Sequence, residues 1–320
     1  MAIERALARP VSKPWGVVDL QPWSKAGRHG QVIGEVWYER RDETACVPSL
    51  RLKLLFTSQP LSIQVHPNDT YAQSMGLSSG KNEAWYILRA APGAKVALGL
   101  KQRLAPRQLR AAIEDGSIAG LVAWQAVAAN DFVSVPAGTI HAIGAGIVIA
   151  EIQQRSDVTF RLFDFGRKRE LHAESAIEVA DAGPVDVGVQ SKRPTDERTL
   201  LVSNLHFAFE RIDLPQDSSW CLRADRETWL LIVGGSARVG PFDVSTGAAV
   251  FAESDEVEIS VGHQGMVALM ASAGSGQPPQ IIERGSLQDI AKAGQQSELP
   301  ATTSSRANPG STIERPGTLQ

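Results

Sequence analysis

The sequence predicts an all-β protein of two β-barrel or sandwich domains, with one short helical insertion in the first. Short segments rich in Val, Ile, Phe, Trp and Tyr recur along the chain and are separated by Pro, Gly, Asn and Asp, a pattern typical of strands joined by turns. These segments form two blocks with a polar stretch between them. A chain of 320 residues is long enough for two domains of common size.

Eight strands are expected in the first block, at residues 32–39, 50–57, 61–66, 84–88, 95–100, 131–135, 146–153 and 158–163. A helical insertion is expected at about residues 104–122, because Leu109 and Ile113 recur at helical spacing with charged residues between them. Gly116 and Gly120 weaken this helix, so two short pieces are an alternative.

A polar stretch rich in small residues, residues 171–198, is the expected linker. The second block then predicts strands at residues 205–214, 228–233, 236–239, 248–252, 257–261 and 266–271, separated by glycine-containing turns. We therefore predict a first domain at 1–185, a related second domain at 186–290 and a disordered tail at 291–320, where bulky apolar side chains are scarce.

Composition and charge exclude several classes of protein. The formal net charge of -3 and the pI near 6.1 offer no overall attraction to nucleic acid or to an anionic membrane. Cys46 and Cys221 form no CxxC pattern, so neither a disulfide framework nor a thiolate metal site is expected. No uninterrupted apolar run of about 18 residues is present. We expect a cytoplasmic protein whose partner is a small molecule.

Paired polar residues on predicted strands indicate a metal site in the first domain. Residues i and i+2 of a strand point to one face, so Gln64 and His66 project together, and Lys81 and Glu83 do the same. His141 follows a Pro-Ala-Gly turn. One Gln, two His and one Glu form a plausible nitrogen and oxygen set for a zinc-like cation.

A charged segment near residues 151–164 adds candidates for substrate chemistry. Asp157, Thr159 and Arg161 share one face of a predicted strand. Arg161 is either ion-paired with Asp157 or Asp164, or stabilises negative charge on a substrate. Glu151 is the nearest carboxylate that could act as an acid or base. The second block has His206 and His263 in no comparable pattern, so we expect it to lack a metal site.

Three longer motifs carry a resemblance to a known family. They read LSIQVHPND at 61–69, GKNEAWYIL at 80–88 and VPAGTIHAIGAGIVIAEIQQRSDVTFRLFDFGR at 135–167, with IGEVWY at 33–38. Together they resemble the type I mannose-6-phosphate isomerase family of the cupin superfamily over roughly residues 14–170, in its compact bacterial form. The second block matches only in general character. The resemblance implies that both domains are cupin-like jelly-roll barrels.

The resemblance also implies a reaction and roles for residues. It implies isomerisation between mannose 6-phosphate and fructose 6-phosphate through a cis-enediol. One Zn2+ per chain would be held by Gln64, His66, Glu83 and His141. The implied catalytic residues are Arg161, Lys81 and Glu151, and the implied substrate-binding residues are Ser62, Lys81 and Arg161. The general base is not assigned, and the chain is expected to be a monomer or a dimer.

Two alternatives remain open at this point. The chain could be a sugar-phosphate-binding cupin without catalysis, because a fold can persist after catalytic activity is lost. It could also be a cupin iron oxygenase that uses two histidines and one carboxylate. Gln64 as a fourth ligand, together with the cations Lys81 and Arg161, favours the isomerase.

Overall fold

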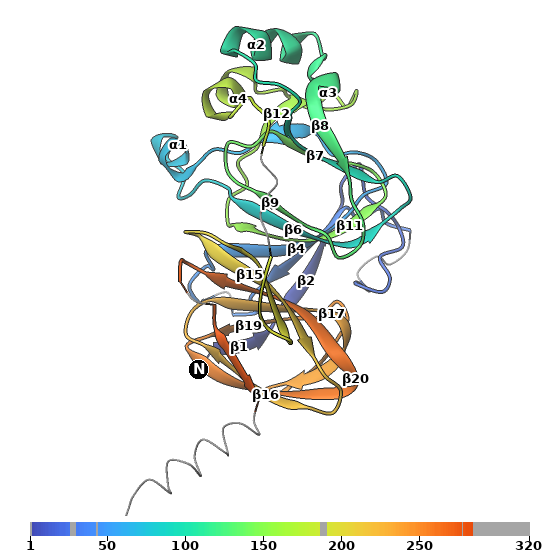
Figure 1. The fold of residues 1–320 in the computed structure, drawn as a ribbon, viewed down its shortest axis with the longest axis vertical. Coiled ribbons are helices and arrows are strands. Elements are labelled where there is room, and N and C mark those ends of the chain that lie inside the picture. Colours follow the sequence, from blue (N-terminus) through green and yellow to red (C-terminus); the bar gives the residue numbers. More distant parts are fainter. Residues whose placement is uncertain (1, 26–29, 43, 186–190, 277, 284–320) are drawn as a thin grey trace, which may run out of the picture. The chain divides into compact units, whose positions relative to one another are not determined.

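Strands dominate the computed structural model of this chain, which describes residues 2–25, 30–42, 44–185, 191–276 and 278–283. They form three sheets in which neighbouring strands pair in antiparallel fashion (Figure 1). The prediction of an all-β, cupin-like fold with a small helical insertion is confirmed. The tail predicted at 291–320 lies outside the described residues.

The first domain contains two sheets. The six-stranded sheet has the order β2 (Leu7–Val11), β3 (Glu35–Glu39), β4 (Leu50–Phe56), β11 (Ile147–Gln154), β6 (Glu83–Ala90) and β9 (Phe132–Val135). The five-stranded sheet has the order β12 (Phe160–Phe163), β5 (Ile63–Val65), β10 (His141–Ile143), β7 (Lys95–Leu100) and β8 (Val122–Ala126).

Apolar side chains from both sheets form the interior of this domain. Leu55, Trp85 and Ile149 of the six-stranded sheet join Val96 and Ile143 of the five-stranded sheet in one buried cluster. In β5, Ile63 and Val65 point instead to a second cluster beneath the helices, as the period of two predicts. Gln64 therefore points to the opposite face of β5, where it lines a cavity.

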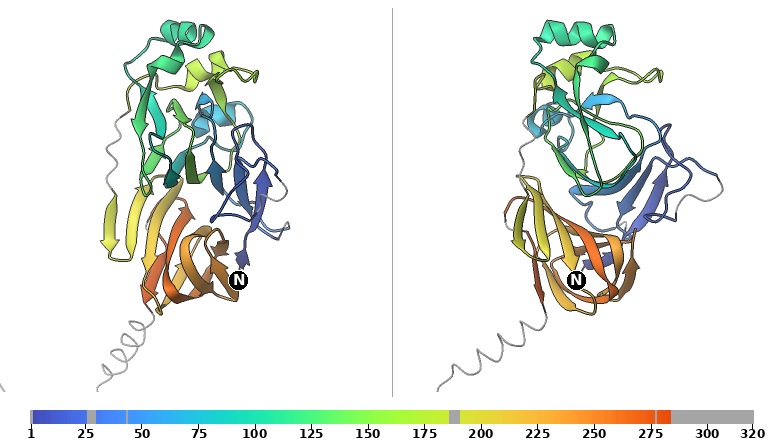
Figure 2. Two further views of the ribbon diagram at one scale, coloured as in Figure 1. Left: turned by 90° about the vertical axis from the view of Figure 1, so that its right-hand side faces the viewer. Right: turned by 45° about the vertical axis from the view of Figure 1, so that its right-hand side comes forward.

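The helices are short. They are α1 (Asp69–Ser74), α2 (Pro106–Glu114), α3 (Ile118–Leu121) and α4 (Ala173–Val179), and the last three lie beside the five-stranded sheet (Figure 2). The predicted insertion thus forms two helices, and Gly116, with φ of +77°, lies between them. No helix in the described ranges is both long enough and apolar enough to cross a bilayer.

The third sheet has ten strands. Its main path runs β1 (Ala2–Arg5), β19 (Ala249–Glu253), β17 (Thr228–Val239), β20 (Asp255–Ala273), β15 (Phe207–Leu214), β14 (Arg198–Ser203) and β13 (Lys192–Thr195), with β16 (Ser219–Ala224), β18 (Phe242–Ser245) and β21 (Gln280–Glu283) paired beside it. Phe209 and Trp229 of this sheet share a buried cluster with Leu52 and Leu54 of β4. One apolar core therefore joins the two β-rich blocks.

Three expectations about elements differ from the structure. The predicted turns at Gly234–Gly235 and near Gly262 are wrong, because β17 and β20 each run through their glycines, with register shifts in the β17–β20 pairing. The predicted linker contains α4, because Ala176 and Ile177 of this helix pack on the first domain. Residues 2–5 pair with β19 in the second block. The domain boundary near residue 185 remains a prediction.

Candidate active site and metal centre

Three segments of the first domain bring the predicted ligands together. Gln64 on β5 has two direct cross-strand neighbours, His141 on β10 and Arg161 on β12. Glu83 begins β6 of the other sheet. His66 follows β5 and, like Glu83 and His141, is buried. The site therefore forms where the two sheets of the domain approach each other.

The side chains of His66, Glu83 and His141 converge on one point. Glu83 Oε1 lies 3.2 Å from His66 Nε2, and Glu83 Oε2 lies 3.9 Å from His141 Nε2. One ligand atom from each residue lies within 4.8 Å of the others. In the described part of the chain, these three residues form a group that could hold a metal ion.

Both imidazoles are oriented by backbone carbonyl groups. His66 Nδ1 lies 2.9 Å from Val158 O, and His141 Nδ1 lies 2.9 Å from Thr139 O. Each Nδ1 therefore carries the proton, which leaves the Nε2 lone pair facing the site. Burial lowers the pKa of His66 to about 3 and also lowers the pKa of His141. Both rings are neutral at physiological pH, as metal ligation requires.

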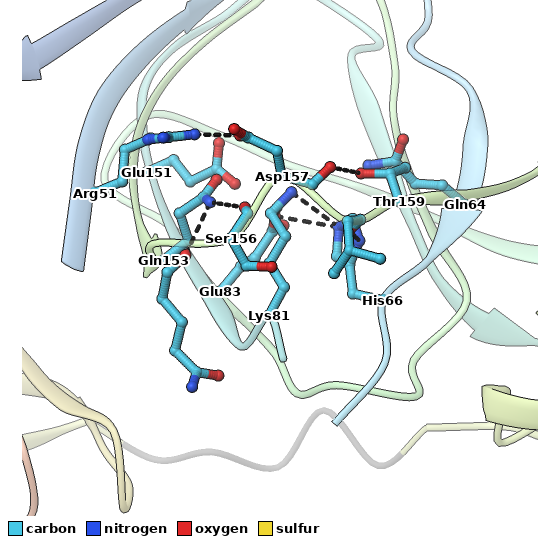
Figure 3. A network of polar contacts seen from close by, with 12 residues as sticks. Arg51, Gln64, His66, Lys81, Glu83, Glu151, Gln153, Ser156, Asp157 and Thr159 are labelled. Atoms are coloured by element: carbon cyan, nitrogen blue, oxygen red, sulfur yellow. Dashed lines mark hydrogen bonds and ion pairs between the residues drawn. The ribbon is translucent and has the colours of Figure 1, made fainter. Parts of the chain in front are cut away.

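Lys81 shows that these donor atoms attract positive charge. Its Nζ lies 2.7 Å from Glu83 Oε1 and 3.2 Å from His66 Nε2, and Figure 3 shows the three side chains together. Burial raises the pKa of Glu83, but the Lys81 ammonium, the hydrogen bond to His66 and the electrostatic effects of His66 and His141 together outweigh it and hold that pKa well below its usual range. The prediction that Lys81 and Glu83 point the same way is confirmed.

Gln64 completes the polar set. Its Nε2 lies 3.2 Å from His141 Nε2, and its Oε1 accepts a hydrogen bond of 2.9 Å from Ser62 Oγ. An amide can present either end after rotation about its last side-chain bond, so Gln64 can offer an oxygen to a cation next to His141. Ser62 is buried, and Ser62 and Gln64 both line a cavity.

A cavity of about 230 Å³ opens beside these residues. Asp157, Thr159 and Arg161 all line it, as their common face on the strand predicts. The ion pair considered for Arg161 does not form in the described chain, because Asp157 pairs with Arg51, and Asp164 pairs with Arg167 and Arg169. Arg161 Nε is buried without a hydrogen-bond partner. Because Arg161 lines the cavity and forms no ion pair within the described residues, its guanidinium can bind a ligand there.

Glu151 lines the same cavity and pairs with a lysine that sequence reasoning missed. Lys53 on β4 is the direct cross-strand neighbour of Glu151 on β11, and Lys53 Nζ lies 3.0 Å from Glu151 Oε2. Burial and the charge of Glu83 raise the pKa of Glu151, and Lys53 partly opposes them. The signal in the sequence was a lone lysine within the apolar run of β4, LRLKLLF.

The cavity is also lined by charged residues that were not predicted from the sequence. Glu35 on β3 accepts a hydrogen bond of 2.6 Å from Trp37 Nε1 and lies 3.5 Å from Lys13 Nζ. Burial raises the pKa of Glu35, but the charges of Lys53, Lys13 and Lys81 and the hydrogen bond from Trp37 together outweigh it and lower that pKa. Arg169 also lines the cavity. The motif IGEVWY contains Glu35 and Trp37, and its mixture of charge and aromatic residues on a strand was the available signal.

Relatives of known identity match part of the chain. It is 38% identical over 194 residues to the mannose-6-phosphate isomerase of Streptococcus mutans, which covers 56% of this chain and 60% of that protein. It is 38% identical over 163 residues to the mannose-6-phosphate isomerase ManA of Bacillus subtilis, covering 48% of this chain and 51% of that protein. The chain thus spans about half to three fifths of the length of the curated relatives it matches. No protein-family model matches the chain.

Solved structures share the fold over a longer span. The mannose 6-phosphate isomerase of Bacillus subtilis has a TM-score of 0.74 at 22% identity and covers 85% of this chain and 99% of its own. A phosphomannose isomerase from Salmonella typhimurium has a TM-score of 0.68 at 14% identity and covers 85% of this chain and 100% of its own. The resemblance of this chain to the mannose-6-phosphate isomerases is therefore confirmed, in sequence over part of its length and in fold over most of it.

Proposed function

We propose that this chain is a zinc-dependent aldose–ketose isomerase that interconverts mannose 6-phosphate and fructose 6-phosphate. The single observation that carries the proposal is the convergence of His66, Glu83 and His141 on one buried point beside a cavity lined by Lys81 and Arg161. The similarity to proteins named mannose-6-phosphate isomerase supports the choice of substrate.

The proposed zinc ligands are Gln64, His66, Glu83 and His141, with one ion per chain. Two neutral imidazoles and one carboxylate are ordinary zinc ligands, and backbone carbonyls fix both rings as metal sites usually require. When bound, zinc supplies Lewis acidity toward the hydroxyl and carbonyl oxygens of a sugar.

The charged walls of the cavity suit a phosphorylated sugar. We assign substrate binding to Ser62, Lys81 and Arg161, all of which line the cavity. Arg161 presents an unpaired guanidinium nitrogen, and a guanidinium binds phosphate or a developing negative charge through charge-assisted hydrogen bonds. Protonated Lys81 adds a second cation next to Glu83.

Proton transfer between C2 and C1, through a cis-enediol, is assigned to residues of the same cavity. We assign Lys81 and Arg161 to charge stabilisation and Glu151 to proton transfer. Burial and the charge of Glu83 raise the pKa of Glu151, and a carboxyl group with a raised pKa exchanges protons near neutral pH more readily than an ordinary one. Lys53 holds this carboxylate in place from the neighbouring strand.

Metal removal tests the proposal as a whole. We expect the chain to produce fructose 6-phosphate from mannose 6-phosphate in a coupled assay, to lose this activity on treatment with a chelator and to regain it with Zn2+. Elemental analysis should show about one zinc ion per chain. We place the reaction in the cytoplasm, with the sugar phosphate as the partner.

The same experiment separates the alternatives. Binding of the sugar phosphate by the zinc-loaded protein without turnover would favour a non-catalytic sugar-phosphate-binding cupin. Oxygen uptake by the iron-loaded protein would favour a cupin oxygenase. A protein that turns over mannose 6-phosphate equally well with and without metal would contradict the zinc assignment.

A further inference from the structure

Asn82 lies between Lys81 and Glu83, is half-buried and is not among the residues that line the cavity. We propose that Asn82 is a positioning residue that holds the segment carrying Lys81 and Glu83 in register with the turn that leads to His141. This inference rests on the proposed metal site, and it concerns how the ligand-bearing segments keep their spacing.

The first contact of Asn82 reaches the turn before His141. The ladder between β6 and β9 ends at the pair Glu83 and Val135, and Pro136 has no N–H with which to continue it. The next residue, Ala137, donates its N–H to Asn82 Oδ1 at 3.0 Å. The same turn supplies Thr139 O, the acceptor that orients the imidazole of His141.

The second contact fixes which way the amide of Asn82 points. Gln154 Oε1 accepts hydrogen bonds from both Asn82 N at 2.9 Å and Asn82 Nδ2 at 2.8 Å. Gln154 Nε2 in turn donates to Asp69 Oδ1 at 3.0 Å, and Gly80 N donates to the same oxygen at 2.8 Å. The amide nitrogen of Asn82 is thus committed to Gln154, which leaves its oxygen for Ala137.

The ligand-bearing segments are otherwise joined by backbone hydrogen bonds. Lys81 N donates to Pro67 O at 3.0 Å, which joins the Lys81–Glu83 segment to the one that carries His66. Gly138 N donates to His66 O at 2.8 Å, which joins the His66 segment to the turn before His141. The third connection joins the Lys81–Glu83 segment to the turn before His141. Beyond the end of the β6–β9 ladder, it depends on the side chain of Asn82.

The test is the zinc affinity of Asn82→Ala, measured by competition with a chromophoric chelator, together with its isomerase kinetics. Loss of a residue that orients metal ligands typically lowers metal affinity or activity by about 10- to 100-fold. We expect a loss of this size in zinc affinity and a fall in kcat. KM should change by less than about threefold, because Asn82 does not line the cavity.

Controls separate positioning from general stability. Gln108→Ala removes another amide that accepts a backbone N–H, that of Ala105 at the start of α2, and it should keep wild-type zinc affinity. If Asn82→Ala shows no cooperative thermal transition, Asn82→Thr carries the same test, because a hydroxyl on a shorter side chain cannot serve both Gln154 and Ala137.

Each outcome decides something. A folded Asn82 variant with unchanged zinc affinity overturns the positioning role. A wild-type protein that binds zinc without isomerising mannose 6-phosphate overturns the proposed activity and leaves the positioning role to be decided by the affinities. A wild-type protein that binds no zinc overturns both.

Discussion

At the scale of single residues, the candidate site combines two neutral imidazoles and one ionised carboxylate with the cations Lys81 and Arg161. The two imidazoles are neutral because they are buried, and Glu83 is ionised because Lys81 lies beside it. Arg161 on β12 differs from the arginines that follow this strand, because Arg167 and Arg169 are both engaged by Asp164. The fold thus leaves one guanidinium in the cavity with unused hydrogen-bonding capacity.

Substitution of Arg161 should reduce catalysis more than it reduces metal binding. We expect Arg161→Ala to lower kcat/KM by about 100- to 1000-fold, the usual cost of removing one group that stabilises developing charge. Zinc content should stay near one ion per chain, because Arg161 is not one of the proposed ligands. Steady-state kinetics and elemental analysis measure both quantities.

The matched control for Arg161 is Arg110→Ala. Arg110 lies on α2, where it forms an ion pair with Glu174 near the surface. Exposed ion pairs contribute little, so wild-type kinetics are expected. Equal losses in the two variants would argue against a role for Arg161 at the reacting atoms.

At the scale of elements, close backbone packing holds the segment before β6 against the segment after β5. A Cβ on Gly80 would lie 2.4 Å from the carbonyl carbon of Asn68 and 2.5 Å from Pro67 O. Only glycine allows this approach, and the approach brings Lys81 and Glu83 to His66. Glycine at this position is therefore required for the close approach of these two segments.

Gly80→Ala should lower the free energy of unfolding by about 1–3 kcal/mol, because the backbone must shift to admit a methyl group. Gly120→Ala is the control. A Cβ at Gly120 meets no atom within 4 Å, and alanine is the better helix former, so this change should raise the free energy of unfolding by about 0.4–1 kcal/mol. Urea denaturation measures both, and equal effects would contradict the packing argument.

The turn after β12 depends on one carboxylate and is therefore sensitive to pH. Asp164 accepts hydrogen bonds from Arg169 Nε at 2.8 Å and from Arg167 Nε at 3.1 Å. Burial raises the pKa of Asp164, but these arginines outweigh it and lower that pKa. A lowered carboxyl pKa stabilises the fold fully above the ordinary value of about 3.9, and this contribution is lost as the pH falls through the folded-state pKa.

The pH prediction uses Asp164→Asn. This variant should be less stable than the wild type by about 1.5–3 kcal/mol at neutral pH, the usual range for hydrogen bonds to charged groups. The difference should shrink as the pH falls below about 4. Asp243→Asn, at an exposed position on β18, should change stability by less than about 0.5 kcal/mol. A difference for Asp164→Asn that does not change with pH would contradict the ion-pair explanation.

At the scale of the whole molecule, a buried carboxylate connects the two β-rich blocks. Glu227 precedes β17 and accepts hydrogen bonds from Ser49 N at 2.6 Å, Ser49 Oγ at 2.7 Å and Leu50 N at 2.9 Å. It also accepts one from Trp229 Nε1 at 3.0 Å. These contacts hold the start of β4, the strand that carries Lys53 into the cavity.

Glu227→Ala should lower the free energy of unfolding by about 3 kcal/mol, because it leaves buried donors without an acceptor. Glu256→Ala removes an exposed carboxylate that pairs with Arg223 and should cost less than about 0.5 kcal/mol. Thermal and urea unfolding of the two variants provide the comparison. If both variants unfold like the wild type, Glu227 does not stabilise the contact between the blocks.

Local periodicity explains why much of the site could be predicted from sequence. A period of two predicts that Gln64 and His66 point the same way, and that Lys81 and Glu83 do so too. In the structure β5 ends at Val65 and β6 begins at Glu83, so one member of each pair lies just outside its strand. The helical insertion also followed from local spacing, with Gly116 at its break. The element boundaries that failed were at glycines in β17 and β20, because a glycine permits a bulge as readily as a turn.

The sequence by itself determined the spacing of the predicted ligands, the presence of the insertion and the motifs that resemble those of the mannose-6-phosphate isomerases. Only the tertiary structure decided which faces meet. The pairing of Lys53 with Glu151 depends on the register between β4 and β11, and the joining of residues 2–5 to β19 depends on a partner almost 250 residues away. Periodicity is a local property of the chain, whereas strand pairing and core packing depend on contacts between distant segments, which no local pattern specifies.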